Sequence, residues 1–582
     1  MKKYFSKILI GIALLTFAAC SDILDEQPRS VLTPGLFRTE EGLISGLNGA
    51  YNGLRYITGT EAIMYSTVLG TDEFTAAASC GTRQLDMDPD NSGTGIDAGT
   101  NSINIPFQFS FSFINSCNGI IEYGTEAGLD EDLIAEAYFL RGYYYFILVQ
   151  MYGGLPLDLG SGSLKYNTTP TTLSARNTTE EVYQAIIADL QHAEEYLPVE
   201  PRLPGCAKKA SAIHFLAKVY LTHGDNQLAL TEAEKLLNPT APYTVNEYGV
   251  ALLPSYSDVI RPANERNAEI MFTCEHTETY AFNETAQGYG SGTVYKDDRS
   301  ISYFVPNYPT WRLDTVFNAS PVVRSTPYSR PWIRLRATAG LLADIFEDKT
   351  NDSRFDATFQ TVWLNNNVRV PGPLSEAGVD TVWNNPGDTA FVMILSHDEV
   401  SQAYRDSKNY RIWTLSQTDR SFFPALKKFF DPNRQDMNDA SGRPFLLAKL
   451  SETYLIAAEA AVNLTDNTKA RNYILVLRER AAKEGHEQDM IDATPATITI
   501  DYILDERSRE LCGEQMRWFD LVRTGKWRER SSTYSLNGVD MLTRNIEAHY
   551  DLRPIPQNQI DLMGNTAAEK RAYQNPGYPA DY

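Results

Sequence analysis

The stretch that decides the fold runs from Ile503 to Trp527 and reads ILDERSRELCGEQMRWFDLVRTGKW. We predict a charge-dense helix here, because after Gly513 apolar residues recur at steps of three and four. Such spacing buries one face of the helix and leaves the charged side chains beside it. Three pairs of opposite charge stand at helical ion-pairing offsets: Asp505 with Arg509, Glu506 with Arg509, and Glu514 with Arg517.

The same stretch raises the alternative of a hydrolase active site. Glycoside hydrolysis needs two carboxylates about 5 to 10 Å apart, and Glu506 and Glu510 lie one helical turn apart. Arg507 and Arg509 are interleaved with them and are expected to hold the pKa of both carboxylates low, the reverse of what a general acid needs. We therefore interpret the stretch as a scaffold helix with paired charges and predict that the protein is not an enzyme.

The charge balance argues against nucleic acid as a partner. The chain has 582 residues and a formal net charge of -22, which repels phosphate backbones and anionic lipid. Five cysteines follow residue 20, an odd number with wide spacing, so we predict neither a disulfide framework nor a zinc site.

Residues 1–19 have the features of an export signal. Three lysines precede a short apolar run at residues 8–17, and two alanines precede Cys20. This order resembles the lipobox of bacterial lipoproteins, which implies lipidation at Cys20 and attachment to a membrane by lipid alone. The alternative is an ordinary secretory signal with an incidental cysteine.

Helical patterns dominate the rest of the chain. Gly70 to about Ile105 is expected to be a long loop, and residues 248–443 are expected to hold turns and short strands such as one after Glu269. Two helix pairs rich in small residues resemble tetratricopeptide repeats. The predicted helices begin after Thr39 and then cover Leu133–Tyr152, Thr178 or Thr179 to Leu197, Lys209–His223, Gln227–Leu237, Leu447–Leu464 and Thr468–Lys483.

Four sequence signatures, in this order and spacing, resemble those of the SusD/RagB lipoproteins. They are LRGYYYF at 140–146 with YGGLP at 152–156, LSETYLIAAEA at 450–460, the stretch 506–523, and PIP at 554–556 with QNPGY at 574–578. The resemblance covers essentially the whole mature chain. It implies a mostly α, SusD-like fold whose tetratricopeptide-like pairs support a loop-rich ligand-binding region. It also implies an N-terminal helical region at 20–245 and a C-terminal region at 246–582, integrated in one body.

The resemblance further implies a function. Such a protein would be a lipid-anchored protein on the surface of the outer membrane that captures oligosaccharides without chemistry. It would pass them to a SusC-like TonB-dependent transporter. The alternatives are capture of peptides, as in the RagB branch, and a surface glycoside hydrolase.

Sugar capture needs flat aromatic faces for pyranose rings and polar groups for hydroxyls. Aromatic residues in the irregular region are therefore the ligand-binding candidates, although each could instead be a core residue. Asp72, at the mouth of the first loop, is a polar candidate whose alternative role is a helix cap. The aromatic candidates are Tyr303, Tyr308, Trp311 and Trp332.

Residues 86–97 approximate a calcium loop, because Asp86, Asp88 and Asp90 alternate and Asp97 stands at the twelfth position. Asn91 occupies the place of the usual glycine, so we favour a solvated acidic loop over a calcium site. No other cofactor is expected.

Overall fold

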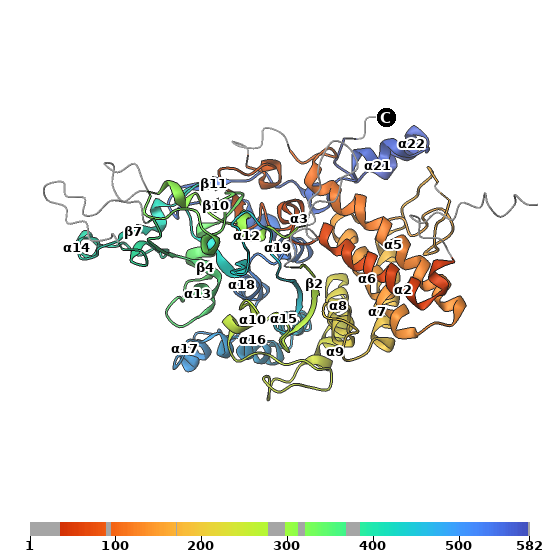
Figure 1. Ribbon diagram of the computed structural model, residues 1–582, viewed down its shortest axis with the longest axis horizontal. Coiled ribbons are helices and arrows are strands. Elements are labelled where there is room, and N and C mark those ends of the chain that lie inside the picture. Colours follow the sequence, from red (N-terminus) through yellow and green to blue (C-terminus); the bar gives the residue numbers. More distant parts are fainter. Residues whose placement is uncertain are drawn as a thin grey trace, which may run out of the picture.

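The computed structural model describes residues 35–88, 95–169, 171–277, 297–311, 320–367 and 385–579. Long helices occupy one side of the molecule, and short strands and loops occupy the other (Figure 1). The expected mostly α fold is confirmed. The long helices pack each on the next in the order α2 (Glu40–Gly53), α5 (Asn101–Ala127), α6 (Glu131–Tyr152), α7 (Thr179–Tyr196), α8 (Lys209–His223), α9 (Asn226–Leu236), α15 (Leu450–Asn463) and α16 (Asn467–Ala481).

Local signals explain where these helices begin and end. The Thr39 side chain accepts a hydrogen bond from the Gly42 backbone N–H at 3.1 Å, which caps α2. Thr178 caps α7 through a reciprocal capping box with Glu181. Between α8 and α9 the chain turns at Gly224, whose φ of 102° suits glycine.

The predicted helices are confirmed, with shifts at their ends. Residues Lys209–His223 form α8 as predicted, and the other helices begin or end within a few residues of their predicted bounds. The helix expected from Leu447 begins instead at Leu450, because the residues before it form a strand. The loop expected to reach Ile105 ends at Thr100, because α5 begins at Asn101.

The charged C-terminal stretch is not one helix, so that prediction is wrong. It forms α18 (Ile500–Leu511), α19 (Arg517–Arg523) and α20 (Trp527–Ser531). Gly513 and Gly525 separate them with φ of 74° and 68°, values that L side chains rarely adopt. A Cβ at Gly513 would also lie 2.8 Å from Leu426 Cδ2, so the turn needs glycine.

Short antiparallel strand pairs cross the irregular region, as predicted, and the strand expected after Glu269 is present. Among the described strands, only β6 and β7 pair in parallel. The pairs are β1 (Phe74–Ala76) with β3 (Leu335–Ala337), β2 (Ile270–Cys274) with β9 (Phe445–Lys449), β4 (Phe359–Gln360) with β8 (Ala425–Leu426), β5 (Val362–Leu364) with β6 (Thr389–Ile394), β6 with β7 (Arg411–Thr414), and β10 (Thr533–Ser535) with β11 (Met541–Thr543).

Short helices fill the connections. They are α3 (Glu61–Thr67), α10 (Tyr256–Val259), α12 (Ser300–Tyr303), the π-helix η6 (Gly340–Ile345), α13 (Arg354–Thr358), α14 (Gln402–Asp406), α17 (Glu487–Asp492), α21 (Gln557–Leu562) and α22 (Ala567–Tyr573). Single 3-10 turns cover Leu36–Arg38, Leu54–Tyr56, Arg83–Asp86, Tyr308–Thr310, Thr326–Tyr328, Leu415–Gln417, Lys427–Phe429 and Ala548–Asp551.

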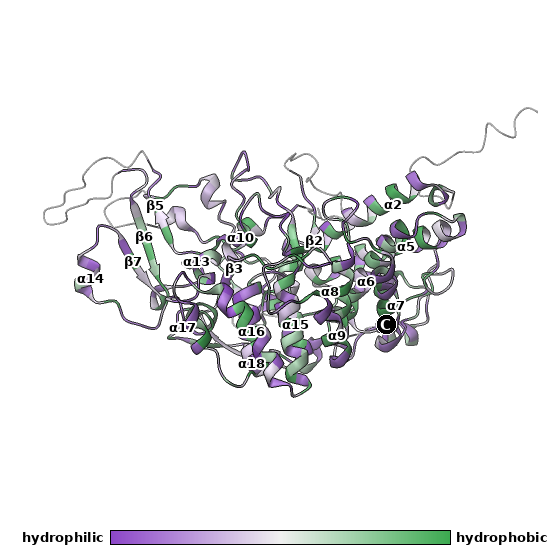
Figure 2. Ribbon diagram, turned by 90° about the horizontal axis from the view of Figure 1, so that it is seen from below, coloured by the Kyte–Doolittle hydropathy of each residue, from purple (hydrophilic) through white to green (hydrophobic). Residues whose placement is uncertain are grey.

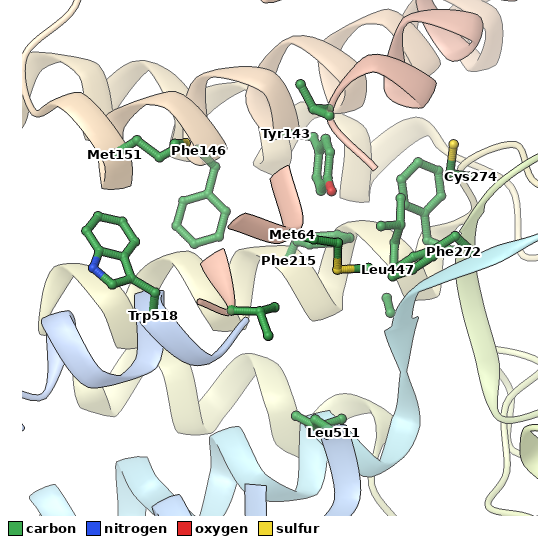
Figure 3. Packing of buried hydrophobic residues seen from close by; sticks show 14 of the residues in the cluster. Met64, Tyr143, Phe146, Met151, Phe215, Phe272, Cys274, Leu447, Leu511 and Trp518 are labelled. Carbon is green, nitrogen blue, oxygen red and sulfur yellow. The ribbon is translucent and has the colours of Figure 1, made fainter. Parts of the chain in front are cut away.

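One hydrophobic core joins both parts of the chain. Figure 3 shows Tyr143 and Phe146 of α6 near Phe215 of α8, and the same cluster includes Leu447 of β9 and Trp518 of α19. Hydrophobic and hydrophilic residues both occur along the long helices, as coloured in Figure 2, and α6 is buried along almost its whole length. Residues of the N-terminal and C-terminal regions therefore share one core, while the predicted boundary at residue 245 stays a prediction.

Candidate functional site

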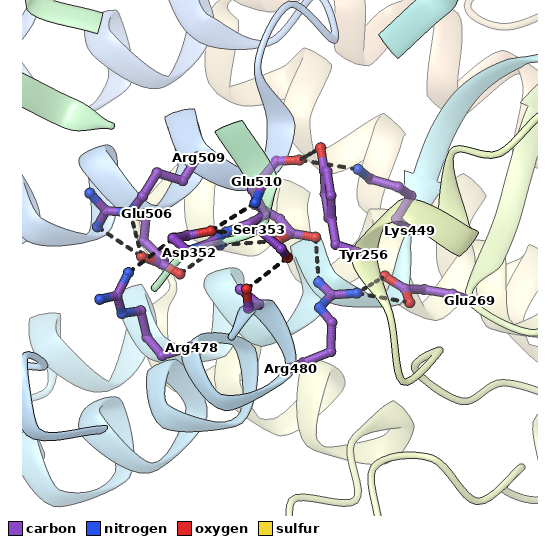
Figure 4. A network of polar contacts seen from close by, with 12 residues as sticks. Tyr256, Glu269, Asp352, Ser353, Lys449, Arg478, Arg480, Glu506, Arg509 and Glu510 are labelled. Atoms are coloured by element: carbon purple, nitrogen blue, oxygen red, sulfur yellow. Dashed lines mark hydrogen bonds and ion pairs between the residues drawn. The ribbon is translucent and has the colours of Figure 1, made fainter. Parts of the chain in front are cut away.

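The two glutamates that suggested an active site lie inside an ion-pair network (Figure 4). Arg354 Nη1 donates to Glu506 Oε1 at 2.8 Å and to Glu510 Oε2 at 3.2 Å. Glu510 also binds Arg480 at 2.6 Å, and Glu506 binds Arg509 at 2.8 Å. The predicted Glu506–Arg509 pair is thus confirmed, but the network is completed by arginines far away in the sequence.

The other two predicted pairs are wrong. Asp505 pairs with Arg530, and Glu514 pairs with Lys428 and Lys449 at 2.5 and 2.6 Å. The Glu514–Arg517 prediction assumed a continuous helix, but Glu514 lies in the turn between α18 and α19. Asp505 and Arg509 do share α18, but Arg509 pairs with Glu506 and Asp505 pairs with Arg530 of α20.

Burial and charge make these glutamates poor general acids. Both side chains are fully buried. Burial alone would raise the pKa of Glu510, but Arg480, Lys449 and Arg354 outweigh it and lower the pKa to about 2. The pKa of Glu506 is likewise held well below its usual range, against burial, by Arg354 and Arg509. The charges are therefore paired as expected of a scaffold, although the partners include Arg354 and Arg480 rather than Arg507.

The interpretation of residues 86–97 as a solvated acidic loop is wrong at Asp86 and Asp88, whereas Asp97 is exposed. Asp86 and Asp88 are 0% and 3% exposed. Asp86 accepts from Arg544 at 2.9 Å, and Asp88 accepts from Arg420 at 2.5 Å. The two carboxylates neutralise the buried guanidinium of Arg544 and the partly buried guanidinium of Arg420. Asp90 lies outside the described residues, and within the described part of the chain no group of three or more His, Cys, Asp or Glu could hold a metal ion.

Three of the four aromatic candidates belong to the core. Tyr303, Tyr308 and Trp311 are 2%, 0% and 3% exposed. Trp311 packs among Trp363, Trp413, Phe391 and Phe422 with ring centroids 4.6 to 5.7 Å away. Buried rings offer no face to a sugar in this structure, and these three residues take the alternative role of core residues that the sequence analysis named. Trp363, a further aromatic residue of this region, is itself fully buried.

Trp332 is different, because its ring is half-buried at the surface. The guanidinium groups of Arg299 and Arg334 lie 5.4 and 5.6 Å from the ring centre. Arg334 also pairs with Glu61 at 3.2 Å. We call these four residues the Trp332 surface. It combines an aromatic ring with charged hydrogen-bonding groups, the combination that sugar capture needs.

Asp72 lines a pocket of about 550 Å³. Its carboxylate accepts two hydrogen bonds from Arg517, at 2.7 and 2.6 Å, and one from Arg530 at 2.8 Å. It does not cap a helix through any described contact, so the alternative role is not seen. The pocket is lined by Asp72, Thr338, Ala339, Gly340, Asp344, Ile345, His397, Asp505, Arg530, Thr533, Tyr534, Ser535, Gly538 and Met541.

Apart from Asp72 and Asp505, the sequence analysis singled out no residue of this pocket. Its walls come from the π-helix, from α18 and α20, from the β10–β11 hairpin and from the loop at His397. Each segment contributes between one and five residues of ordinary type, so no local motif signals the pocket. The only sequence signal was the concentration of acids and arginines in the C-terminal stretch.

The structure also describes the five cysteines that follow residue 20 and the long helices. Cys80, Cys117, Cys206, Cys274 and Cys512 are free and buried, as expected without a disulfide framework. Among the described helices, none is both long and apolar enough to cross a bilayer. Cys20 and the leader lie outside the described residues.

Solved structures define the class of fold. A laminarin-binding SusD-like protein matches with a TM-score of 0.62 and 21% identity over 93% of this chain and 100% of its own. A SusD homologue from Bacteroides thetaiotaomicron matches with a TM-score of 0.63 and 18% identity, covering 92% of this chain and 97% of its own. Helix pairs that support a loop-rich region therefore make this a SusD-like fold, as the sequence signatures implied.

Sequence comparisons then identify the family. The family model described as SusD family matches residues 264–578, and one described as starch-binding associating with outer membrane matches residues 23–221. The chain belongs to the SusD family. It is 25% identical to the SusD-like protein P2 of Formosa agariphila over 99% of this chain and 100% of that protein.

Proposed function

We propose that this protein captures a glycan and passes it to a SusC-like TonB-dependent transporter without chemical change. The observation that carries the proposal is the pair of family matches over residues 23–221 and 264–578, one of which describes starch binding at the outer membrane. The laminarin-binding SusD-like protein, of similar fold, supports a saccharide as the kind of ligand.

The Trp332 surface supports the same function in chemical terms. The half-buried indole of Trp332 can pack on the C–H face of a pyranose, while the guanidinium groups of Arg299 and Arg334 donate to hydroxyl oxygens. Neither step breaks a covalent bond. A non-catalytic role also agrees with the buried, ion-paired state of Glu506 and Glu510.

Replacing Trp332 by alanine is expected to weaken glycan binding at least tenfold, about 1.4 kcal/mol, because the stacking face is lost. Affinity electrophoresis in gels containing different polysaccharides first identifies the glycan, and calorimetry then measures its affinity. Tyr404→Ala serves as the control, because Tyr404 is also exposed, at 45%, but lies on α14 outside the Trp332 surface.

Unchanged binding by Trp332→Ala would remove this surface from the proposal. Calorimetry with peptide mixtures tests the alternative ligand class, and binding of peptides without glycans would replace glycan capture by peptide capture. Release of new reducing ends from a polysaccharide, lost in Glu506→Gln, would show a hydrolase instead.

Replacing Cys20 by alanine is expected to release the protein from the membrane, because the proposed anchor is a lipid on this cysteine and the described helices cannot span a bilayer. Detergent phase partitioning of the wild type and the variant measures this directly. Replacement of the neighbouring Ser21 by alanine is the control, and it should leave the wild-type partitioning unchanged. A Cys20 variant that still partitions into detergent would contradict lipid anchoring.

A further inference from the structure

The pocket at Asp72 is separated from the Trp332 surface by the β1–β3 ladder. At one end of the ladder the Ser79 N–H donates to the Ile333 carbonyl, next to Trp332. At the other end the Thr338 N–H donates to the Glu73 carbonyl, next to Asp72. Five residues of extended chain span roughly 17 Å. A ligand in the pocket therefore occupies a place distinct from the Trp332 surface.

The floor of the pocket is a fixed array of hydrogen-bonding groups. Arg530 donates to three carboxylates, those of Asp72 at 2.8 Å, Asp501 at 3.3 Å and Asp505. Arg517 holds Asp72 from the other side at 2.6 and 2.7 Å. Although burial would raise the pKa of Asp72, the two arginines lower it to about 2 and keep it ionised. The side chains are thus held in place before any ligand arrives.

The rim adds polar and apolar contacts. Asp344 and His397 pair at 2.7 Å, and their side chains are 65% and 56% exposed. Met541, 63% exposed, offers an apolar surface on the β10–β11 hairpin. The π-helix that carries Gly340 and Asp344 forms one wall; π-helical turns are rare and are frequent at functional sites.

The chemistry of the lining selects the ligand. Three lining carboxylates face one lining guanidinium, so an anionic ligand is repelled, whereas hydroxyl groups can donate to the carboxylate oxygens. A metal ion is disfavoured, because these acids do not form a metal-binding group within the described chain. The volume of about 550 Å³ falls within the ~300–1,000 Å³ of small-molecule sites.

We propose that this pocket is a second saccharide site, selective for neutral sugars over uronic acids. This proposal rests on the proposed function. It adds a second saccharide-binding site and a preference of that site for neutral over anionic sugars. Binding here depends on hydrogen bonds to preorganised carboxylates rather than on aromatic stacking. The two sites therefore respond to different substitutions.

Gly340 allows a direct test. A Cβ at this position meets nothing closer than Asp344 Oδ2 at 3.7 Å and Thr338 Oγ1 at 3.8 Å, both on the pocket wall. The backbone at Gly340 therefore accepts a Cβ, and Gly340→Phe is designed to place a ring in the pocket that this residue lines. Gly49→Phe is the matched control, because Gly49 is exposed on α2 with no atom within 4 Å of the added Cβ. Asp344→Ala is a second, milder variant at an exposed position.

Calorimetric titration uses neutral trisaccharides of glucose, galactose and mannose, and trigalacturonic acid as their anionic counterpart. We expect two classes of site for a neutral trisaccharide in the wild type. Gly340→Phe should remove the class of site that belongs to the pocket, and Asp344→Ala should weaken saccharide binding to it. Trp332→Ala and Gly49→Phe should leave binding to the pocket intact. Trigalacturonic acid should not occupy this class.

The outcomes separate the two proposals. The second site would be overturned if Trp332→Ala abolished saccharide binding while Gly340→Phe and Asp344→Ala left it unchanged. The proposed function would stand in that case. Occupation of the pocket by trigalacturonic acid would overturn its charge preference. Failure of the wild type to bind any of these saccharides would contradict both proposals.

Discussion

Replacing Arg354 by alanine is expected to lower the free energy of unfolding by about 3 to 5 kcal/mol. Arg354 is fully buried and pairs with Asp352 at 2.7 Å, Glu506 at 2.8 Å and Glu510 at 3.2 Å. Its removal leaves three buried carboxylates with fewer positive partners to balance their charge. Equilibrium unfolding in urea, followed by circular dichroism, measures the change.

Arg38→Ala is the matched control for this variant. Arg38 also pairs with a glutamate, Glu126, at 2.9 Å, but the two side chains are 51% and 53% exposed. Exposed pairs contribute about 0 to 1 kcal/mol, so this variant should unfold almost as the wild type does. An equally small effect for Arg354→Ala would show that the buried network is not needed for stability.

The pH dependence gives a second measurement of the same effect. The folded-state pKa of Glu510 is about 2, below its ordinary 4.5. A lowered carboxyl pKa adds stability that is fully present above about pH 4.5 and is lost as the pH falls toward 2. The gap in stability between the wild type and Arg354→Ala should therefore narrow between pH 5 and pH 3. A gap independent of pH would contradict an electrostatic origin.

Replacing Trp311 by alanine is expected to destabilise the fold by about 3 to 5 kcal/mol, since a buried tryptophan is lost from a tight aromatic cluster. Its ring lies 4.8 Å from that of Trp413 and 4.6 Å from that of Phe422. Thermal unfolding and urea unfolding of the variant measure the loss. Trp332→Ala is the control within the same region, because its half-buried ring should cost much less on removal.

This comparison also separates the core from the binding surface. Trp332→Ala should keep its stability and lose glycan affinity, whereas Trp311→Ala should lose stability. A stable Trp311→Ala protein that no longer binds glycan would show that Trp311 contacts the ligand, as its place in a loop-rich segment first suggested.

The sequence predicted most helices because helical hydrogen bonds and caps are local. Apolar residues that recur at steps of three and four mark a helix over a short stretch. The caps at Thr39 and Thr178 and the turn at Gly224 likewise act within a few residues of the structure they specify. The four family signatures likewise identified the SusD-like fold without any coordinates. Gly513 was visible in the sequence, but the left-handed turn that it makes was not predicted.

Only the tertiary structure decided which charges pair and which aromatic rings are exposed. Arg354 reaches Glu506 across 152 positions of sequence, and Asp72 reaches Arg530 across 458. Ion pairs and burial depend on distance in space, which sequence spacing gives only inside a single helix. The pocket around Gly340 and Asp72 is assembled from several separate segments, so for the same reason it has no signature in the sequence. The fold that brings these segments together does have sequence signatures.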